Sequence, residues 1–207
     1  MKINKNKNKD KSLNLNLNDL ISFHLNKRNA GEIGEDEGIY REFENFLRFQ
    51  EYSIENLNFI LWYRVYKEEF NKLPSKQSQL SPSPKVLRKK QKSNNDIDVC
   101  NQPFRQEIDN VINIYFNSSS SFELNLPFDI KFRSIEMLKF STHPDCFHLS
   151  YTHIYDLIQH SSIPQFLSQS QYQSQYHSSN NINRNSSSSH FNNNPRSSKL
   201  KFWRYFL

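Results

Sequence analysis

The feature that most constrains this chain is a long apolar helix that leaves almost no polar face. Ser53 is a favourable N-cap residue, Glu55 falls in the first turn, and Pro74 stops the helix near Leu73. The apolar positions between these limits are Leu57, Phe59, Ile60, Leu61, Trp62, Val65, Tyr66 and Phe70. They cover most of the circumference at 3.6 residues per turn, so this helix must be buried on several sides, as in the middle of a bundle.

Apolar residues recur at helical spacing in most of the other dense segments. The spacing predicts helices at 19–26, 43–49, 104–116, 125–140 and 144–158, and a last short helix at 163–167. In the fourth of these, Asn125 is expected to cap the helix and Pro127 to lie in its first turn. No segment shows convincing strand alternation, and three glycines argue against a turn-rich β-sandwich. The predicted fold class is all-α.

Composition divides the chain into one domain with two tails. Residues 1–18 alternate Asn with Lys or Leu, and residues 169–207 are rich in Ser, Asn and Gln, so both are predicted to be disordered. Residues 31–38 form a predicted acidic loop. The helical domain is expected to span 19–168, with a flexible, solvated insertion at 75–102 that carries Ser-Pro repeats and a basic run.

Charge and cysteine content indicate the cellular setting. The net charge is +6, and much of the excess lies in the predicted flexible segments, which favours anionic partners. The basic, aromatic end at 199–207 predicts a weak association with anionic membrane. Without a secretory signal or a long apolar run, the chain is predicted to be cytoplasmic, and its basic end adds a predicted location at the inner face of the plasma membrane. Cys100 and Cys146 are then expected to be reduced.

Motifs for catalysis, metal binding and nucleic-acid reading are missing or incomplete. His143, Cys146, His148 and His153 cluster in the sequence, but Cys146 lacks the paired spacing of a zinc site. No Gly-x-Ser-x-Gly elbow is present, and the basic runs accompany no known reader motif. We therefore predict no catalytic residue, no metal, no cofactor and no specific nucleic acid, with a basic RNA-associated protein as a distant alternative.

Three motifs occur in order along the chain, at 51–59, 123–126 and 161–167, and they are similar to those of the regulator-of-G-protein-signalling (RGS) domain. The first, at 51–59, reads Glu-Tyr-Ser-Ile-Glu-Asn-Leu-Asn-Phe and resembles the family signature that opens a long helix. The second is Glu-Leu-Asn-Leu at 123–126, and the third is the Phe-Leu ending at 161–167. The internal Pro- and Ser-rich insertion, the Gln-Pro-Phe-Arg block at 102–105 and Thr-His-Pro at 142–144 resemble fungal-type members. The resemblance spans residues 39–168.

This resemblance implies a bundle of about nine helices that binds the α subunit (Gα) of a heterotrimeric G protein. Such domains accelerate GTP hydrolysis by preferring the transition-state arrangement of the Gα switch regions, so the chain itself is not an enzyme. The resemblance implies that Asn125 orients the Gα glutamine, since an amide donates and accepts hydrogen bonds without adding charge. The implied contact residues are Glu51, Tyr52, Ser53, Glu55, Asn56, Asn125, Leu126, Leu157, Ser161 and Gln165.

The chain departs from the family pattern at three positions in or beside these motifs. Active family members carry an acidic residue at the position of Ser161, an Arg at that of Gln165, and an acidic residue at that of Pro127. These changes remove charged contacts to Gα. The alternative reading is therefore an RGS-fold interaction module that binds a partner without accelerating hydrolysis. Glu55 and Asn56 could also be ordinary first-turn residues, and Asn125 only a cap.

Overall fold

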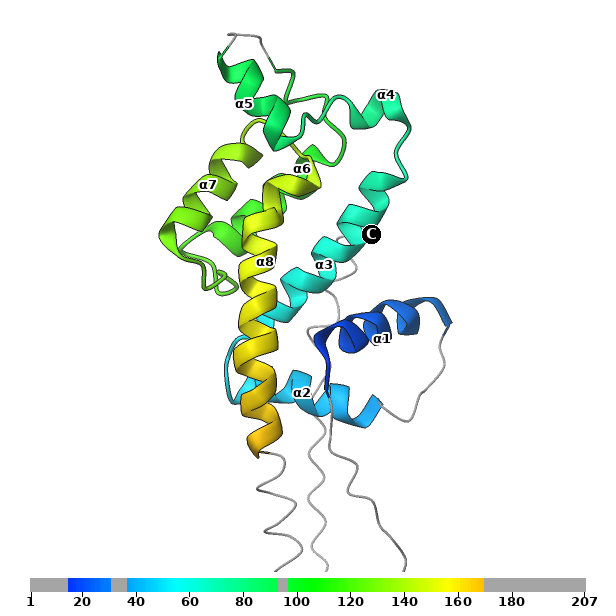
Figure 1. Ribbon diagram of the computed structural model, residues 1–207, viewed down its shortest axis with the longest axis vertical. Helices are drawn as coiled ribbons and strands as arrows, with labels where there is room; N and C mark the ends of the chain where they lie inside the picture. The colour runs from blue at the N-terminus through cyan, green and yellow to red at the C-terminus, as the bar shows by residue number, and fades with distance from the viewer. Residues whose placement is uncertain (1–14, 31–36, 93–96, 170–207) are drawn as a thin grey trace, which may run out of the picture.

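The structure is a computed structural model that describes residues 15–30, 37–92 and 97–169 (Figure 1). Within these ranges it is all-helical and contains no strand, which confirms the predicted class. The α-helices are α1 (Leu17–Ala30), α2 (Glu37–Phe49), α3 (Ile54–Asn71), α4 (Ser75–Ser78), α5 (Pro84–Lys92), α6 (Arg105–Val111), α7 (Phe128–Leu138) and α8 (His148–Leu157). A 3-10 turn, Pro144–Phe147, leads into α8, and π-helical turns, Ile112–Phe116 and Ile158–Ser162, extend α6 and α8.

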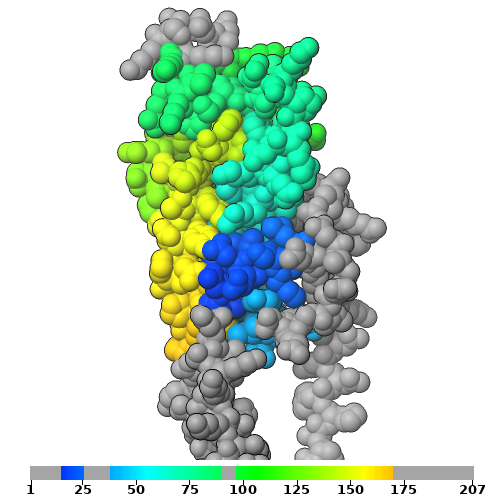
Figure 2. All heavy atoms as spheres, turned by 45° about the vertical axis from the view of Figure 1, so that its right-hand side comes forward, coloured from blue at the N-terminus to red at the C-terminus, as the bar shows by residue number. Residues whose placement is uncertain are grey.

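Helix α3 runs through the middle of the molecule beside α8. It packs against α1, α2 and α8, while α7 packs against α8. Helices α1 and α2 lie at one end, and α4 and α5 lie at the other (Figures 1 and 2). The α2–α3 loop and the C-terminal end of α3 therefore belong to opposite ends of the bundle.

The core of the molecule is built on α3, as its sequence predicts. The helix buries Asn56, Leu57, Phe59, Ile60, Leu61, Trp62, Tyr63, Tyr66 and Phe70. Phe147, which is fully buried, lies against this surface: its ring centroid is 5.2 Å from that of Trp62 and 6.2 Å from that of Phe59. Edge-to-face geometry at these distances is the favoured arrangement for aromatic pairs.

Several buried polar groups beside this core have specific hydrogen-bond partners. Trp62 Nε1 donates to Glu107 Oε1 at 2.8 Å, and the Tyr66 hydroxyl donates to the carbonyl oxygen of Thr142. Gln102, 4% exposed, donates to the Phe140 carbonyl oxygen and accepts from the Thr142 backbone N–H, both at 2.9 Å. Leaving such groups without partners would cost about 1–3 kcal/mol each. These bonds fix segment 140–142 against α3.

Residues 75–92 differ from the solvated linker expected there. They contain α4 and α5, and Leu87 and Ser81 are each 2% exposed. The Ser81 hydroxyl bonds that of Thr142 at 2.5 Å, and the Ser141 hydroxyl donates to the Pro82 carbonyl oxygen at 2.7 Å. Composition misled the prediction because one buried leucine and a few hydroxyl contacts suffice to hold a polar segment. Residues 93–96 lie outside the described ranges.

The N-terminal boundary also shifts relative to the sequence prediction. Leu15 and Leu17 are buried, at 5% and 0% exposure, so the last residues of the predicted arm belong to the domain. They join α1, which is longer than the expected 19–26 helix. Most of the predicted 31–38 loop and of both predicted tails lies outside the described residues.

The predicted cap at Asn125 is wrong, and the last helix is not separate. Pro127, rather than Asn125, occupies the position before α7, and Ser53 precedes α3 without a side-chain capping bond. Residues 163–169 continue from α8 through the π-helical turn without a break. The ring of Pro164 would clash with the His160 carbonyl in a regular α-helix, and the wider π turn relieves that clash.

Replacing Phe147 tests the dependence of the fold on this core. We expect Phe147→Ala to lower the free energy of unfolding by about 3–5 kcal/mol, because it removes a fully buried ring from among several aromatic side chains. Phe49→Ala is the matched control, since Phe49 is 62% exposed. Urea unfolding followed by circular dichroism measures both. Equal losses in the two variants would contradict the assigned core.

Candidate functional site

The structure brings the first and third sequence motifs together through one carboxylate. Glu51, in the α2–α3 loop, accepts through Oε1 from the Ser53 hydroxyl at 2.9 Å and from the Ser162 hydroxyl at 2.8 Å. Ser162 is fully buried and lies in the π-helical turn that extends α8, 111 positions from Glu51. Hydrogen bonds to a charged acceptor are among the stronger ones. Glu51 therefore fixes the α2–α3 loop to the end of α8.

The α2–α3 loop is tight and presents one aromatic side chain to solvent. The backbone N–H groups of Gln50 and Glu51 donate to the Phe46 carbonyl oxygen, and that of Ser53 donates to the Leu47 carbonyl oxygen at 2.8 Å. Tyr52 has a positive φ of 56° and is 77% exposed. A bulky residue in this conformation is uncommon, and such strain concentrates at functional sites. Tyr52 is therefore available to a partner.

The second motif lies on a loop that is anchored from both sides. The Leu124 backbone N–H donates to the Tyr115 carbonyl oxygen at 2.9 Å, and Leu124 is buried. Glu123 forms an ion pair with Lys131 of α7. Between these anchors and α7, Asn125 is exposed and Leu126 is half-buried. An exposed amide on a loop held in this way is positioned to meet a partner.

Tyr115 connects the second motif to the first. Its ring centroid lies 5.5 Å from that of Phe59, while its carbonyl oxygen holds Leu124. Burial raises the pKa of the Tyr115 hydroxyl, and the nearby carboxylate of Glu55 raises it further. The first motif therefore adjoins the second through Tyr115 and the third through Ser162.

Two carboxylates lie close together in the first motif. Burial raises the pKa of Glu55 above its usual value; a backbone hydrogen bond opposes this, and the charge of Glu51 adds to the rise. Within the described part of the chain, neither Glu51 nor Glu55 forms an ion pair. This part of the site therefore carries uncompensated negative charge, which suits a basic partner.

Asn56 differs from the expected contact residue. It is 1% exposed, and its Oδ1 atom is buried without a hydrogen-bond partner. The physical reason is the position of α3: a helix buried on several sides turns its first-turn residue inward as well. Direct contact between Asn56 and a partner would need a local rearrangement.

The remaining predicted residues lie along the last helix. Leu157 is half-buried, and Ser161 and Gln165 are exposed, at a spacing of four residues that keeps them on neighbouring turns. Ser161 adjoins Ser162 and so lies beside the Glu51 contact, whereas among the described residues no hydrogen bond or ion pair joins Gln165 to the other motifs. Ser162 and Tyr115 are the residues that sequence reasoning missed, because only the fold reveals their partners.

Cys146 and His143, which belong to the His and Cys cluster in the sequence, have structural roles in the fold. Cys146 is fully buried, and burial raises the pKa of its thiol to about 12. His143 Nδ1 accepts from the Asp145 backbone N–H at 3.2 Å, which caps the turn before α8. Among the residues that the structure describes, no group of three or more His, Cys, Asp or Glu side chains could hold a metal ion.

No protein-family model matches this chain, and no curated protein matches it significantly. None of the helices in the described ranges is long and apolar enough to cross a membrane.

The pKa of Glu55 predicts how the site affects stability with pH. Because the folded-state pKa lies above the unfolded value, the folded chain binds the proton more tightly, and ionisation above that pKa destabilises it. We expect Glu55→Gln to raise the free energy of unfolding at pH 7 and to lose this advantage as the pH falls below about 4.5. Urea unfolding at pH 7 and pH 4 measures the difference. Asp129→Asn, at an exposed site, is the control, and a Glu55→Gln effect that is the same at both pH values would contradict the assignment.

Proposed function

We propose that this chain is an RGS-type domain that binds the α subunit of a heterotrimeric G protein and accelerates its GTP hydrolysis. The proposal rests on the resemblance of three motifs and on their arrangement in the fold. Motifs that resemble one family's partner-binding segments adjoin one another here, although they are far apart in sequence.

The observation that carries the proposal is the hydrogen bond from Ser162 to Glu51. It joins the first motif to the third across 111 positions. A separate contact joins the second motif to the first, because Leu124 is hydrogen-bonded to Tyr115, which lies near Glu55.

The mechanism follows from a preference for one state of the partner. A protein that binds the transition-state arrangement of the switch regions more tightly than the ground state lowers the barrier by the difference. Asn125 is the residue suited to this, because its amide is exposed on an anchored loop. Glu51 and Glu55 supply negative charge that attracts basic side chains of the partner.

A binding module without GTPase acceleration is the second candidate, and two observations favour it. Asn56 is buried, so one of the two asparagines that the resemblance assigns to the partner is withdrawn from the surface. Ser161 and Gln165 are exposed but uncharged, so the positions that carry charged contacts in active family members offer only hydrogen bonds here. Both changes remove contacts that the resemblance assigns to Gα.

Asn125→Ala tests the first candidate directly. Asn125 makes no capping bond, so alanine removes its amide without a helix-capping penalty. We expect the variant to keep its helical circular dichroism spectrum. Its stimulation of GTP hydrolysis by Gα should fall roughly 5- to 150-fold, because one interfacial hydrogen bond contributes about 1–3 kcal/mol. Single-turnover GTP hydrolysis by Gα measures the effect. Asn71→Ala, at the far end of α3, is the control and should match wild type.

Two outcomes separate the candidates. If wild type binds Gα in its transition-state-mimic form but does not stimulate hydrolysis, the binding module is correct and acceleration is wrong. If wild type neither binds nor stimulates any Gα, both readings fail.

The substitution Asn56→Leu tests whether the buried asparagine contacts the partner or contributes only to the core. Leucine has a similar size and removes the unpartnered Oδ1 atom, so unfolding stability should be unchanged or higher. We expect stimulation to stay within about threefold of wild type, because the side chain does not reach the surface. A large loss of stimulation in a stably folded variant would show that Asn56 is exposed when the partner binds.

A further inference from the structure

The end of the molecule opposite the proposed Gα site is rich in positive charge. Between Glu69 and Asp96 the sequence contains no acidic residue and seven basic ones: Lys72, Lys76, Lys85, Arg88, Lys89, Lys90 and Lys92. The structure places residues 70–92, with α4 and α5, at the end away from α1 and α2 (Figures 1 and 2). In the described part of the chain, Lys76, Lys85 and Arg88 are exposed and form no ion pair.

Helix α5 is held in a fixed orientation. Leu87 is 2% exposed and packs into the core, and its backbone N–H donates to the Ser83 carbonyl oxygen at 2.9 Å. With Leu87 facing inward, Lys85 and Arg88 face solvent. The loop before α5 is bound to segment 141–142 through Ser81 and Pro82. The basic surface is therefore attached to the domain through ordered contacts.

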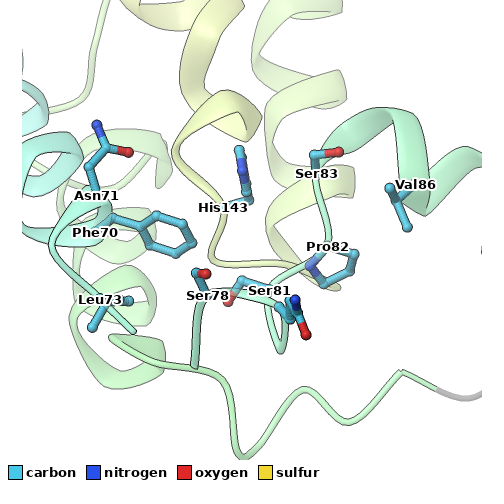
Figure 3. A pocket seen from close by; sticks show the side chains of 10 residues that line it. Phe70, Asn71, Leu73, Ser78, Ser81, Pro82, Ser83, Val86 and His143 are labelled. Carbon is cyan, nitrogen blue, oxygen red and sulfur yellow. The ribbon is translucent and has the colours of Figure 1, made fainter. Parts of the chain in front are cut away.

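Two large aliphatic side chains are exposed at the same end of the molecule. Leu80 is 44% exposed and Val86 is 42% exposed. Val86 also lines an open cleft of about 510 Å³, together with Phe70, Leu73 and Pro82 (Figure 3). The cleft lining contains no Asp or Glu. The cleft lies between α3 and the 78–83 loop, and neutral polar side chains such as Asn71 and Ser83 line it as well as apolar ones.

We propose that this α4–α5 end docks on the surface of an anionic lipid bilayer. Lys85 and Arg88 lie against the anionic headgroups, and Leu80 and Val86 enter the interfacial region. Cations beside exposed aliphatic side chains are the combination that a membrane interface stabilises. A nucleic acid would instead favour aromatic side chains for base stacking, and within 75–89 the exposed large apolar residues, Leu80 and Val86, are aliphatic.

This surface is independent of the proposed Gα site. It lies on other elements and shares none of the residues of the three motifs. It also differs from the basic, aromatic end at 199–207, from which the sequence predicts a membrane contact of its own. Variants in α5 therefore separate the two contacts within the full chain.

Flotation of the full chain with vesicles tests the proposal. We use phosphatidylcholine vesicles with and without 30% phosphatidylserine, at physiological salt. Lys85→Gln with Arg88→Gln should bind the anionic vesicles about 30-fold more weakly, because each cation near such a surface contributes about 1 kcal/mol and 1.36 kcal/mol is a factor of ten. Leu80→Ser with Val86→Ser should also weaken binding, while retaining its preference for anionic vesicles.

The matched control removes the same charge elsewhere. Arg41→Gln with Arg133→Gln changes two exposed arginines on α2 and α7, and should bind as wild type does. Circular dichroism checks that all variants are folded. Wild-type binding by the α5 charge variant, equal losses in the control, or no wild-type binding to anionic vesicles would each overturn the proposal. Tighter binding to a single-stranded RNA oligomer than to the vesicles at the same salt would overturn it as well.

Discussion

The burial of α3 on several sides is the constraint on which the rest of this structure depends. A helix with so little polar surface is stable only when other elements cover it, and α1, α2, α8 and the turn at Phe147 do so. The α2–α3 loop and the cleft beside α5 lie at its two ends. One end receives the α2–α3 loop and the end of α8. The other opens into the cleft beside α5.

The same burial explains why the candidate site is maintained at a cost in stability. Glu51 Oε2 and Asn56 Oδ1 are buried without partners, and burial raises the pKa of Glu55 because it disfavours the charged carboxylate. Each feature lowers stability, since buried polar groups lose water without regaining full hydrogen bonding. Proteins retain such groups where a function requires them. The concentration of three of them in one motif argues that the first motif does more than begin a helix.

The sequence predicts α3 well because periodic apolar residues determine which faces are buried. It predicts the short-range details poorly. Ser53 and Asn125 are favourable capping residues, but Ser53 turns to Glu51, and Pro127 sets the start of α7 instead of Asn125. The Glu51–Ser162 bond leaves no trace in composition or spacing, because it depends on how α8 packs. Residues 75–92 have the composition of a linker, and Leu87 alone hints that the segment joins the core.

The two proposed surfaces are linked by the geometry of α3. At 1.5 Å per residue, its 18 residues extend about 27 Å. Because α3 is held along this length by buried contacts, the α2–α3 loop and the α5 end keep a fixed separation. A domain docked on a bilayer through α5 would hold the α2–α3 loop away from the surface by a distance on the order of the length of α3, about 27 Å, depending on tilt. A partner that binds the docked domain at the α2–α3 loop must therefore place its own binding surface at that distance from the bilayer.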